Sequence, residues 1–107
     1  MRITITARHA DIPDALRLRA RVLLERLTKV ASRSHDGQVI FGTDHGMASA
    51  EVRLHTARGT IHVGTAAAVD HRSALDRAAA KVRRQLDKAV ARRRAARVRR
   101  AREREPQ

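Results

Sequence analysis

Apolar residues along the chain switch between two spacings, and this switch limits the folds that the sequence can form. Residues 2–7 alternate apolar and polar side chains with a period of two, which is typical of a strand with one buried face. Residues 16–31 instead place Leu and Ala at three- and four-residue spacing along one side of a helix. Asp11 and Pro13 predict where this helix starts, and we expect it to end between Ser32 and Gly37.

Three short strands are predicted next, at residues 38–42, 48–56 and 60–65. Thr43 to Met47 should form a flexible loop between the first two. Arg58 and Gly59 are candidates for a hairpin turn between the last two, because glycine accepts positive φ without steric cost. If that turn is tight, Leu54 faces Val63 on the buried side and His55 faces His62 on the outer side.

A second helix is predicted from Asp70, and its side chains separate into two arcs at about 100° per residue. The apolar arc contains Leu75, Ala78, Val82, Leu86, Ala89 and Val90, and the basic arc contains Arg77, Lys81, Arg84 and Lys88. Asp76 and Asp87 fall outside the basic arc. Beyond Ala91 the apolar pattern gives way to arginines, which predicts either a frayed extension of the helix or a disordered basic tail.

The order strand, helix, three strands, helix predicts an α+β two-layer sandwich. A four-stranded sheet would carry both helices on one face, so that each element covers its own apolar side. We expect one domain at residues 1–91 and an Arg-rich tail or helix extension at 92–107.

The charge of the chain indicates a polyanionic partner. Lys and Arg number 24 against 11 Asp and Glu, for a formal net charge of +13. Nucleic acid or an anionic membrane would attract such a chain. We expect no membrane span and no signal peptide, and therefore a cytoplasmic location, because no long apolar run is present. Phe41 is the one aromatic residue, which argues against recognition by base stacking.

Catalytic and metal sites are not expected. Cysteine is absent, so thiolate chemistry and cysteine zinc sites are excluded. Of the six histidines only His55 and His62 are expected to be neighbours, whereas a structural zinc ion needs four ligands. No Ser, His and Asp grouping has the spacing of a catalytic site. We therefore predict a protein that is not an enzyme and needs no cofactor and no small-molecule substrate.

The row formed by Arg77, Lys81, Arg84 and Lys88 is the leading functional candidate. Phosphate recognition needs cations along a rigid support, and one helical face supplies them about every 5 to 6 Å. A solvated helix face is the alternative, but it usually interleaves carboxylates with the cations, and here none is interleaved. The Arg-rich end has two open interpretations, an RNA contact or a solubilising terminus.

Several stretches of the sequence resemble the ribosome hibernation-promoting factor family, which is also called the ribosome-associated inhibitor or sigma-54 modulation protein family. The similarity spans roughly residues 2 to 91, and its most specific part lies in the second helix. The stretches are Ile3-Thr4-Ile5-Thr6-Ala7-Arg8-His9, Pro13, Ala50-Glu51-Val52-Arg53-Leu54, Asp70 with Ala74-Leu75-Asp76, and Lys81-Val82-Arg83-Arg84-Gln85-Leu86.

The resemblance implies a β-α-β-β-β-α fold similar to double-stranded-RNA-binding domains. It also implies binding to ribosomal RNA in the channel between the head and body of the small ribosomal subunit, where the protein would reversibly block messenger RNA and transfer RNA. By position, the family resemblance assigns RNA contacts to Arg26, Lys29, Lys81, Arg84 and Lys88. With Arg77 from the row, Arg8 after the first strand and Arg92 at the start of the Arg-rich end, these residues form the predicted RNA-binding set.

Two positions depart from the family pattern. Ala7 stands where the family usually has Gly, and Arg72 where it usually has Tyr, so the loop that enters the second helix is expected to seat differently. The sequence shows no counterpart of the C-terminal domain with which long family members pair two ribosomes, and its end is basic where another branch is acidic. Pairing of ribosomes and silencing of single ribosomes therefore both remain open.

Two other functions are compatible with the sequence. A general module for double-stranded RNA or DNA would bind naked duplex as well as it binds ribosomal subunits. A basic protein that docks on an acidic protein partner would be displaced only weakly by RNA.

Overall fold

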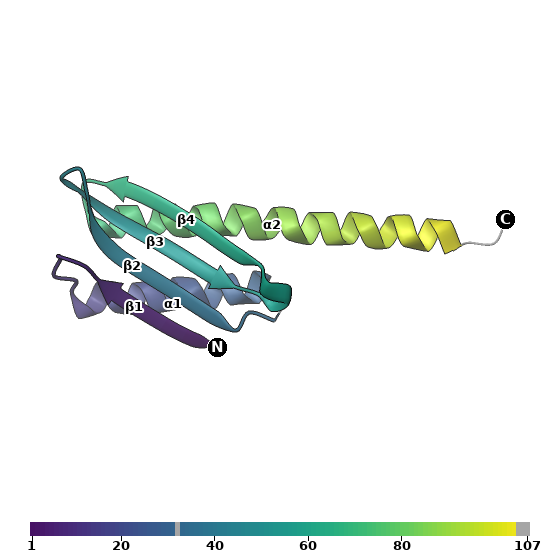
Figure 1. Ribbon diagram of the computed structural model, residues 1–107, viewed down its shortest axis with the longest axis horizontal. Coiled ribbons are helices and arrows are strands. Elements are labelled where there is room, and N and C mark those ends of the chain that lie inside the picture. Colours follow the sequence, from purple (N-terminus) through teal and green to yellow (C-terminus); the bar gives the residue numbers. More distant parts are fainter. Residues whose placement is uncertain (32, 105–107) are drawn as a thin grey trace.

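The computed structural model describes residues 1–31 and 33–104 and forms one mixed four-stranded sheet with two helices (Figure 1). The elements follow in the order β1 (Arg2–Ala7), α1 (Asp14–Val30), β2 (Asp36–Asp44), β3 (Met47–His55), a 3-10 turn (Ala57–Gly59), β4 (Ile61–Ala68) and α2 (His71–Arg104). Ser32, in the expected end of the first helix, and residues 105–107 of the expected tail lie outside the described residues. Both helices cover the same face of the sheet, so the predicted α+β sandwich is confirmed.

The strands lie in chain order across the sheet. β1 pairs with β2 in parallel, and the other two neighbouring pairs are antiparallel. A parallel pair needs a long connection, and α1 provides it between β1 and β2. The strand expected at 2–7 is confirmed, and β4 runs on to Ala68, past the expected end at 65, through alanines whose low strand propensity gives no signal.

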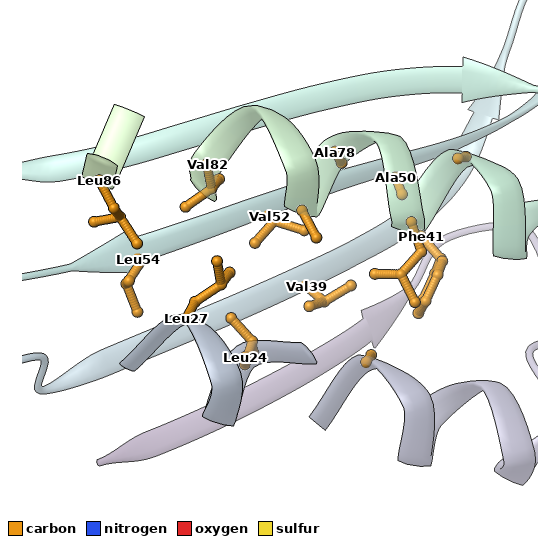
Figure 2. Close-up of a cluster of buried hydrophobic side chains, with 14 of the residues drawn as sticks. Leu24, Leu27, Val39, Phe41, Ala50, Val52, Leu54, Ala78, Val82 and Leu86 are labelled. Atoms are coloured by element: carbon orange, nitrogen blue, oxygen red, sulfur yellow. The ribbon is translucent and has the colours of Figure 1, made fainter. Parts of the chain in front are cut away.

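The core lies between the sheet and the two helices (Figure 2). Val39, Phe41, Val52 and Leu54 point from the central strands toward Leu24 and Leu27 of α1 and toward Ala78, Val82 and Leu86 of α2. All of these side chains are buried, as the alternation in the strands and the apolar stripes in the helices predict. The apolar arc of the second helix is confirmed except that Ala89 and Val90 are only half-buried.

The expected flexible loop at residues 43–47 is wrong. β2 and β3 continue to Asp44 and from Met47, and only His45 and Gly46 connect them. Both connecting residues have positive φ, 49° and 79°, as in the two-residue turns that match the twist of a hairpin. The connection is therefore a tight turn rather than a loop.

The expected register between the last two strands is also wrong, by one residue. Leu54 pairs with His62, and Val63 pairs with Arg53 on the outer face, where its side chain is 38% exposed. The connection contains a 3-10 turn and is longer than the tight hairpin that the prediction assumed, although Gly59 does adopt positive φ. Because side chains alternate faces, one extra residue moves every side chain of β4 to the opposite face.

Candidate nucleic-acid interface

The start of α2 is fixed by Asp70. The backbone N–H of Ser73 donates a hydrogen bond to Oδ1 of Asp70 over 2.7 Å, which satisfies one of the unpaired donors of the first turn. That bond, together with one from the Ser73 hydroxyl, lowers the pKa of Asp70. The orientation of the helix about its own axis is then fixed by the core, into which Leu75, Val82 and Leu86 pack.

This orientation turns the predicted basic row outward. Arg77, Lys81, Arg84 and Lys88 are all exposed, on the side of α2 that faces solvent above β4. None of the four forms an ion pair within residues 1–31 and 33–104. Their charges are therefore not neutralised by the carboxylates of the same helix.

Those carboxylates pair with other arginines, on the side of α2 that faces α1. Asp76 accepts two hydrogen bonds of 2.9 Å from Arg19 of α1, and this bonding raises the pKa of Arg19. Asp87 accepts from Arg83 over 3.1 Å, one turn apart on the same helix. Asp76 thus stabilises the contact between the helices, Asp87 forms an ion pair within α2, and both leave the basic row cationic.

Lys81 differs from the rest of the row because it contacts the sheet. Its ammonium group donates to the backbone carbonyl of Thr65, and the side-chain amide of Gln85 donates to the carbonyl of Val63 over 2.6 Å. Both carbonyls belong to β4, the strand at the edge of the sheet, where carbonyl groups lack a neighbouring strand. An ammonium group has three donors, so Lys81 can protect this edge and still bind an anion.

Arg8 lies at the far edge of the sheet from the basic row. Its backbone N–H donates to the carbonyl of Phe41 over 2.8 Å, which extends the pairing of β1 by one residue. Arg8 and Lys81 both line a shallow hollow of about 710 Å³ on the outer face of the sheet. Asp44 and Glu51 line it as well, so the charge of this face is mixed.

Arg26 and Lys29 are exposed on α1 and do not join the basic row. Lys29 lines a hollow between the end of α1 and α2, beside Asp87 and Arg94. This position is on the side of α2 that faces α1, whereas Lys81 contacts β4 on the other side. The predicted set is therefore divided into separate groups rather than gathered in one patch.

Arg92 belongs to a third group of arginines, and the other members of this group are not in the predicted set. It lines a hollow of about 490 Å³ together with Arg33, Arg93 and Arg97, at the end of the sheet where β3 connects to β4. Of the two alternatives for this end, a helix extension or a disordered tail, the described residues form the helix extension, which continues to Arg104. Ala and Arg rank among the best helix formers, and this composition was the signal for it.

Two classes of site are not found in the described part of the chain. No group of three or more His, Cys, Asp and Glu side chains within residues 1–31 and 33–104 is arranged to hold a metal ion. In the same part of the chain, no helix combines the length and the apolar character that crossing a membrane requires.

Residues 3–94 match a protein family described as "Sigma 54 modulation protein / S30EA ribosomal protein". The match covers β1 through the middle of α2, including the basic row. The chain belongs to this family. It is the family that the sequence motifs predicted, so the resemblance is confirmed. No curated protein sequence gives a significant match.

The fold of this chain is shared by solved structures that include the following two. The N-terminal domain of Protein Y from Thermus thermophilus superposes with a TM-score of 0.70 at 23% identity, over 82% of this chain and 98% of its own. A ribosomal subunit interface protein from Coxiella burnetii gives a TM-score of 0.73 at 22% identity, over 85% of this chain and 99% of its own. At these identities the likeness establishes the fold.

Proposed function

We propose that this S30EA family protein binds the small ribosomal subunit through phosphates of ribosomal RNA and blocks translation reversibly by filling the decoding channel. The observation that carries the proposal is the basic row, whose cations have no carboxylate partners among the described residues and lie on a helix held by the core. Family membership supports the ribosome as the partner. The name of the similar Coxiella burnetii protein supports a site at the subunit interface.

The proposed mechanism is steric and involves no chemical step. Basic side chains position the protein on phosphates, and selectivity comes from the match between the folded domain and the shape of its channel. The space that the sheet and helices occupy is then closed to messenger RNA and transfer RNA. Such a factor needs no cofactor and acts in the cytoplasm with the ribosomes.

The predicted residues take different parts in this mechanism. Arg77, Arg84 and Lys88 contact phosphates directly, because their charges have no other partner in the described chain. Lys81 adds a contact while it holds the edge of β4. Arg8, Arg26, Lys29 and Arg92 contact RNA at the flanks of the domain.

Co-sedimentation with isolated small subunits over a salt series tests the proposal. The variant R77Q/R84Q/K88Q removes three charges from the row and leaves Lys81 and its contact with β4 in place. The variant R2Q/R21Q/R72Q removes the same charge from exposed positions outside the row and serves as the matched control. Affinity falls as salt rises, and each phosphate contact makes this dependence steeper. By the relation for duplex DNA, the loss of three contacts should make the slope of log affinity against log salt shallower by about 2 to 3.

Each outcome has a defined meaning. Loss of affinity in the row variant but not in the control supports the proposal, whereas equal affinity of the row variant and the unmodified protein contradicts it. Excess naked RNA duplex serves as competitor. Subunit binding that survives the duplex supports recognition of the channel, and binding that the duplex removes completely identifies a general double-stranded nucleic-acid module instead.

A further inference from the structure

α2 continues well beyond the sheet, and we call its residues 92–104 the overhang. Figure 1 shows the overhang projecting past the connection between β3 and β4. It is about 20 Å long at 1.5 Å per residue, and all of its side chains are exposed. It contains eight arginines and one glutamate among its described residues.

Four of these arginines continue the buried stripe of the helix. Leu75, Val82 and Leu86 are seven and four residues apart and face the sheet. The next positions of the same stripe are taken by Arg93, Arg97, Arg100 and Arg104, which we call the underside arginines. The side of α2 that is apolar over the sheet therefore becomes cationic where the sheet ends.

The end of the sheet and the overhang form a concave corner. The hollow of about 490 Å³ lies in this corner, with Arg92, Arg93 and Arg97 on the helix and Arg33, Thr56 and Thr60 opposite. Arg33 comes from the segment between α1 and β2 and has a φ of 62°, a left-handed backbone conformation. None of the described residues that line the hollow carries a carboxylate, so none of them neutralises the four guanidinium groups.

The underside arginines and the basic row lie on opposite sides of α2. Arg84 and Arg93 are nine residues apart, as are Lys88 and Arg97, and nine residues at about 100° each amount to half a turn beyond two full turns. A helix with its side chains is about 10 to 12 Å across. A single stretch of nucleic-acid backbone therefore cannot lie along both sides.

We infer that the underside arginines, with Arg33, form a second surface for nucleic-acid backbone, so that one molecule holds two RNA duplex segments at once. The inference relies on the proposed function only for the nature of the partner. Guanidinium groups bind phosphate oxygens in pairs, which suits an arginine-lined corner. Val98 is the one large apolar residue among the described residues of the overhang, so the overhang offers no apolar face for a membrane or a protein partner.

A capture experiment with two RNA duplexes tests the second surface. One RNA duplex of about 24 base pairs is immobilised on a support, and a second duplex in solution carries a fluorophore. The fluorescent duplex stays on the support only if one protein molecule binds both duplexes. The variant R93Q/R97Q/R100Q alters the underside, and R94Q/R99Q/R102Q removes the same charge from the other sides of the overhang. Glutamine keeps a good helix propensity, and circular dichroism checks that both variants fold.

We expect the unmodified protein and the control variant to capture the second duplex, and the underside variant to capture at least about tenfold less of it at equal salt. Binding to a single duplex, measured by fluorescence anisotropy, should persist in the underside variant through the basic row. Equal capture by both variants, or capture absent from the unmodified protein, overturns the inference. Retention on anionic lipid vesicles that requires the underside and resists duplex RNA overturns it as well.

The two proposals fail in different experiments. Failure of the proposed function appears as subunit co-sedimentation that the row variant R77Q/R84Q/K88Q does not weaken. Failure of the second surface appears as duplex capture that does not distinguish the two overhang variants, whatever the row variant does.

Discussion

At the scale of single residues, Gly64 sets the distance between α2 and the sheet. The inner face of β4 presents small residues to α2, and a Cβ atom at Gly64 would overlap the carbonyl oxygen of Ala78. It would also come within 3.0 Å of the Lys81 Cβ and 3.1 Å of a Val82 methyl group. The position of the basic row above β4 thus depends on the absence of one side chain.

Gly64→Ala should destabilise the protein by about 1 to 3 kcal/mol, because α2 must move away from β4 to admit the methyl group. Urea unfolding measures the change. Gly42→Ala is the matched control, since its added Cβ would meet mainly the Ser49 hydroxyl, at 3.2 Å, on the outer face of the sheet. A similar loss in both variants would contradict the close approach of helix and strand at Gly64.

The register between β3 and β4 gives a second prediction at this scale. Leu54→Ala should cost about 2 to 5 kcal/mol because Leu54 is fully buried. Val63→Thr should change stability by no more than about 0.5 kcal/mol, because Val63 is on the outer face. Comparable losses for the two substitutions would instead support the tight-turn register, in which both side chains are buried.

At the scale of elements, periodicity predicted each helix and strand but not how they connect. The stripes of α1 and α2 and the alternation in β1 are long enough to determine a buried face. The connections depend on single residues, and the errors in the loop and in the register arose there, at His45 and Gly46 and in the 3-10 turn before β4. The basic row was predictable because it follows from the same helical period as the core. The corner was not, because only the fold brings Arg33 close to Arg93.

The start of α2 gives a prediction about pH. The pKa of Asp70 is lower in the folded protein than in the unfolded chain, because the Ser73 N–H and hydroxyl donate to its carboxylate. Its stabilising contribution is therefore complete above the unfolded pKa, about 4, and is lost as the pH falls through the lower folded value. In Asp70→Asn, which caps the helix without ionising, the melting temperature should fall less steeply below pH 4 than in the unmodified protein. Identical slopes in thermal melts at pH 2 to 5 would show that this carboxylate does not contribute.

At the scale of the whole molecule, electrostatic repulsion among the arginines of the overhang opposes the stability of its helix. The molecule measures 64 × 25 × 20 Å because α2 extends beyond the sheet, and the overhang gains no core contacts there. Helix propensity favours it, whereas repulsion among closely spaced arginines opposes it. Any ligand that neutralises the arginines therefore stabilises the helix, which couples binding to the order of the overhang.

This balance predicts that helicity rises with salt. Between about 10 and 150 mM salt the Debye length falls from about 30 to 8 Å, so repulsion between arginines on neighbouring turns weakens. The circular dichroism signal at 222 nm of the unmodified protein should become more negative over this range, while the sheet and the buried part of α2 remain unchanged. In R93Q/R97Q/R100Q the change should be clearly smaller, because three of the repelling charges are gone. An equal change in both proteins would place the salt effect elsewhere in the chain. No change in either protein would mean that helix propensity alone keeps the overhang helical.

Short RNA duplexes should produce the same gain in helicity at low salt. The duplexes bring phosphates to the arginines directly, so a much lower concentration of phosphate than of simple salt should produce the same gain.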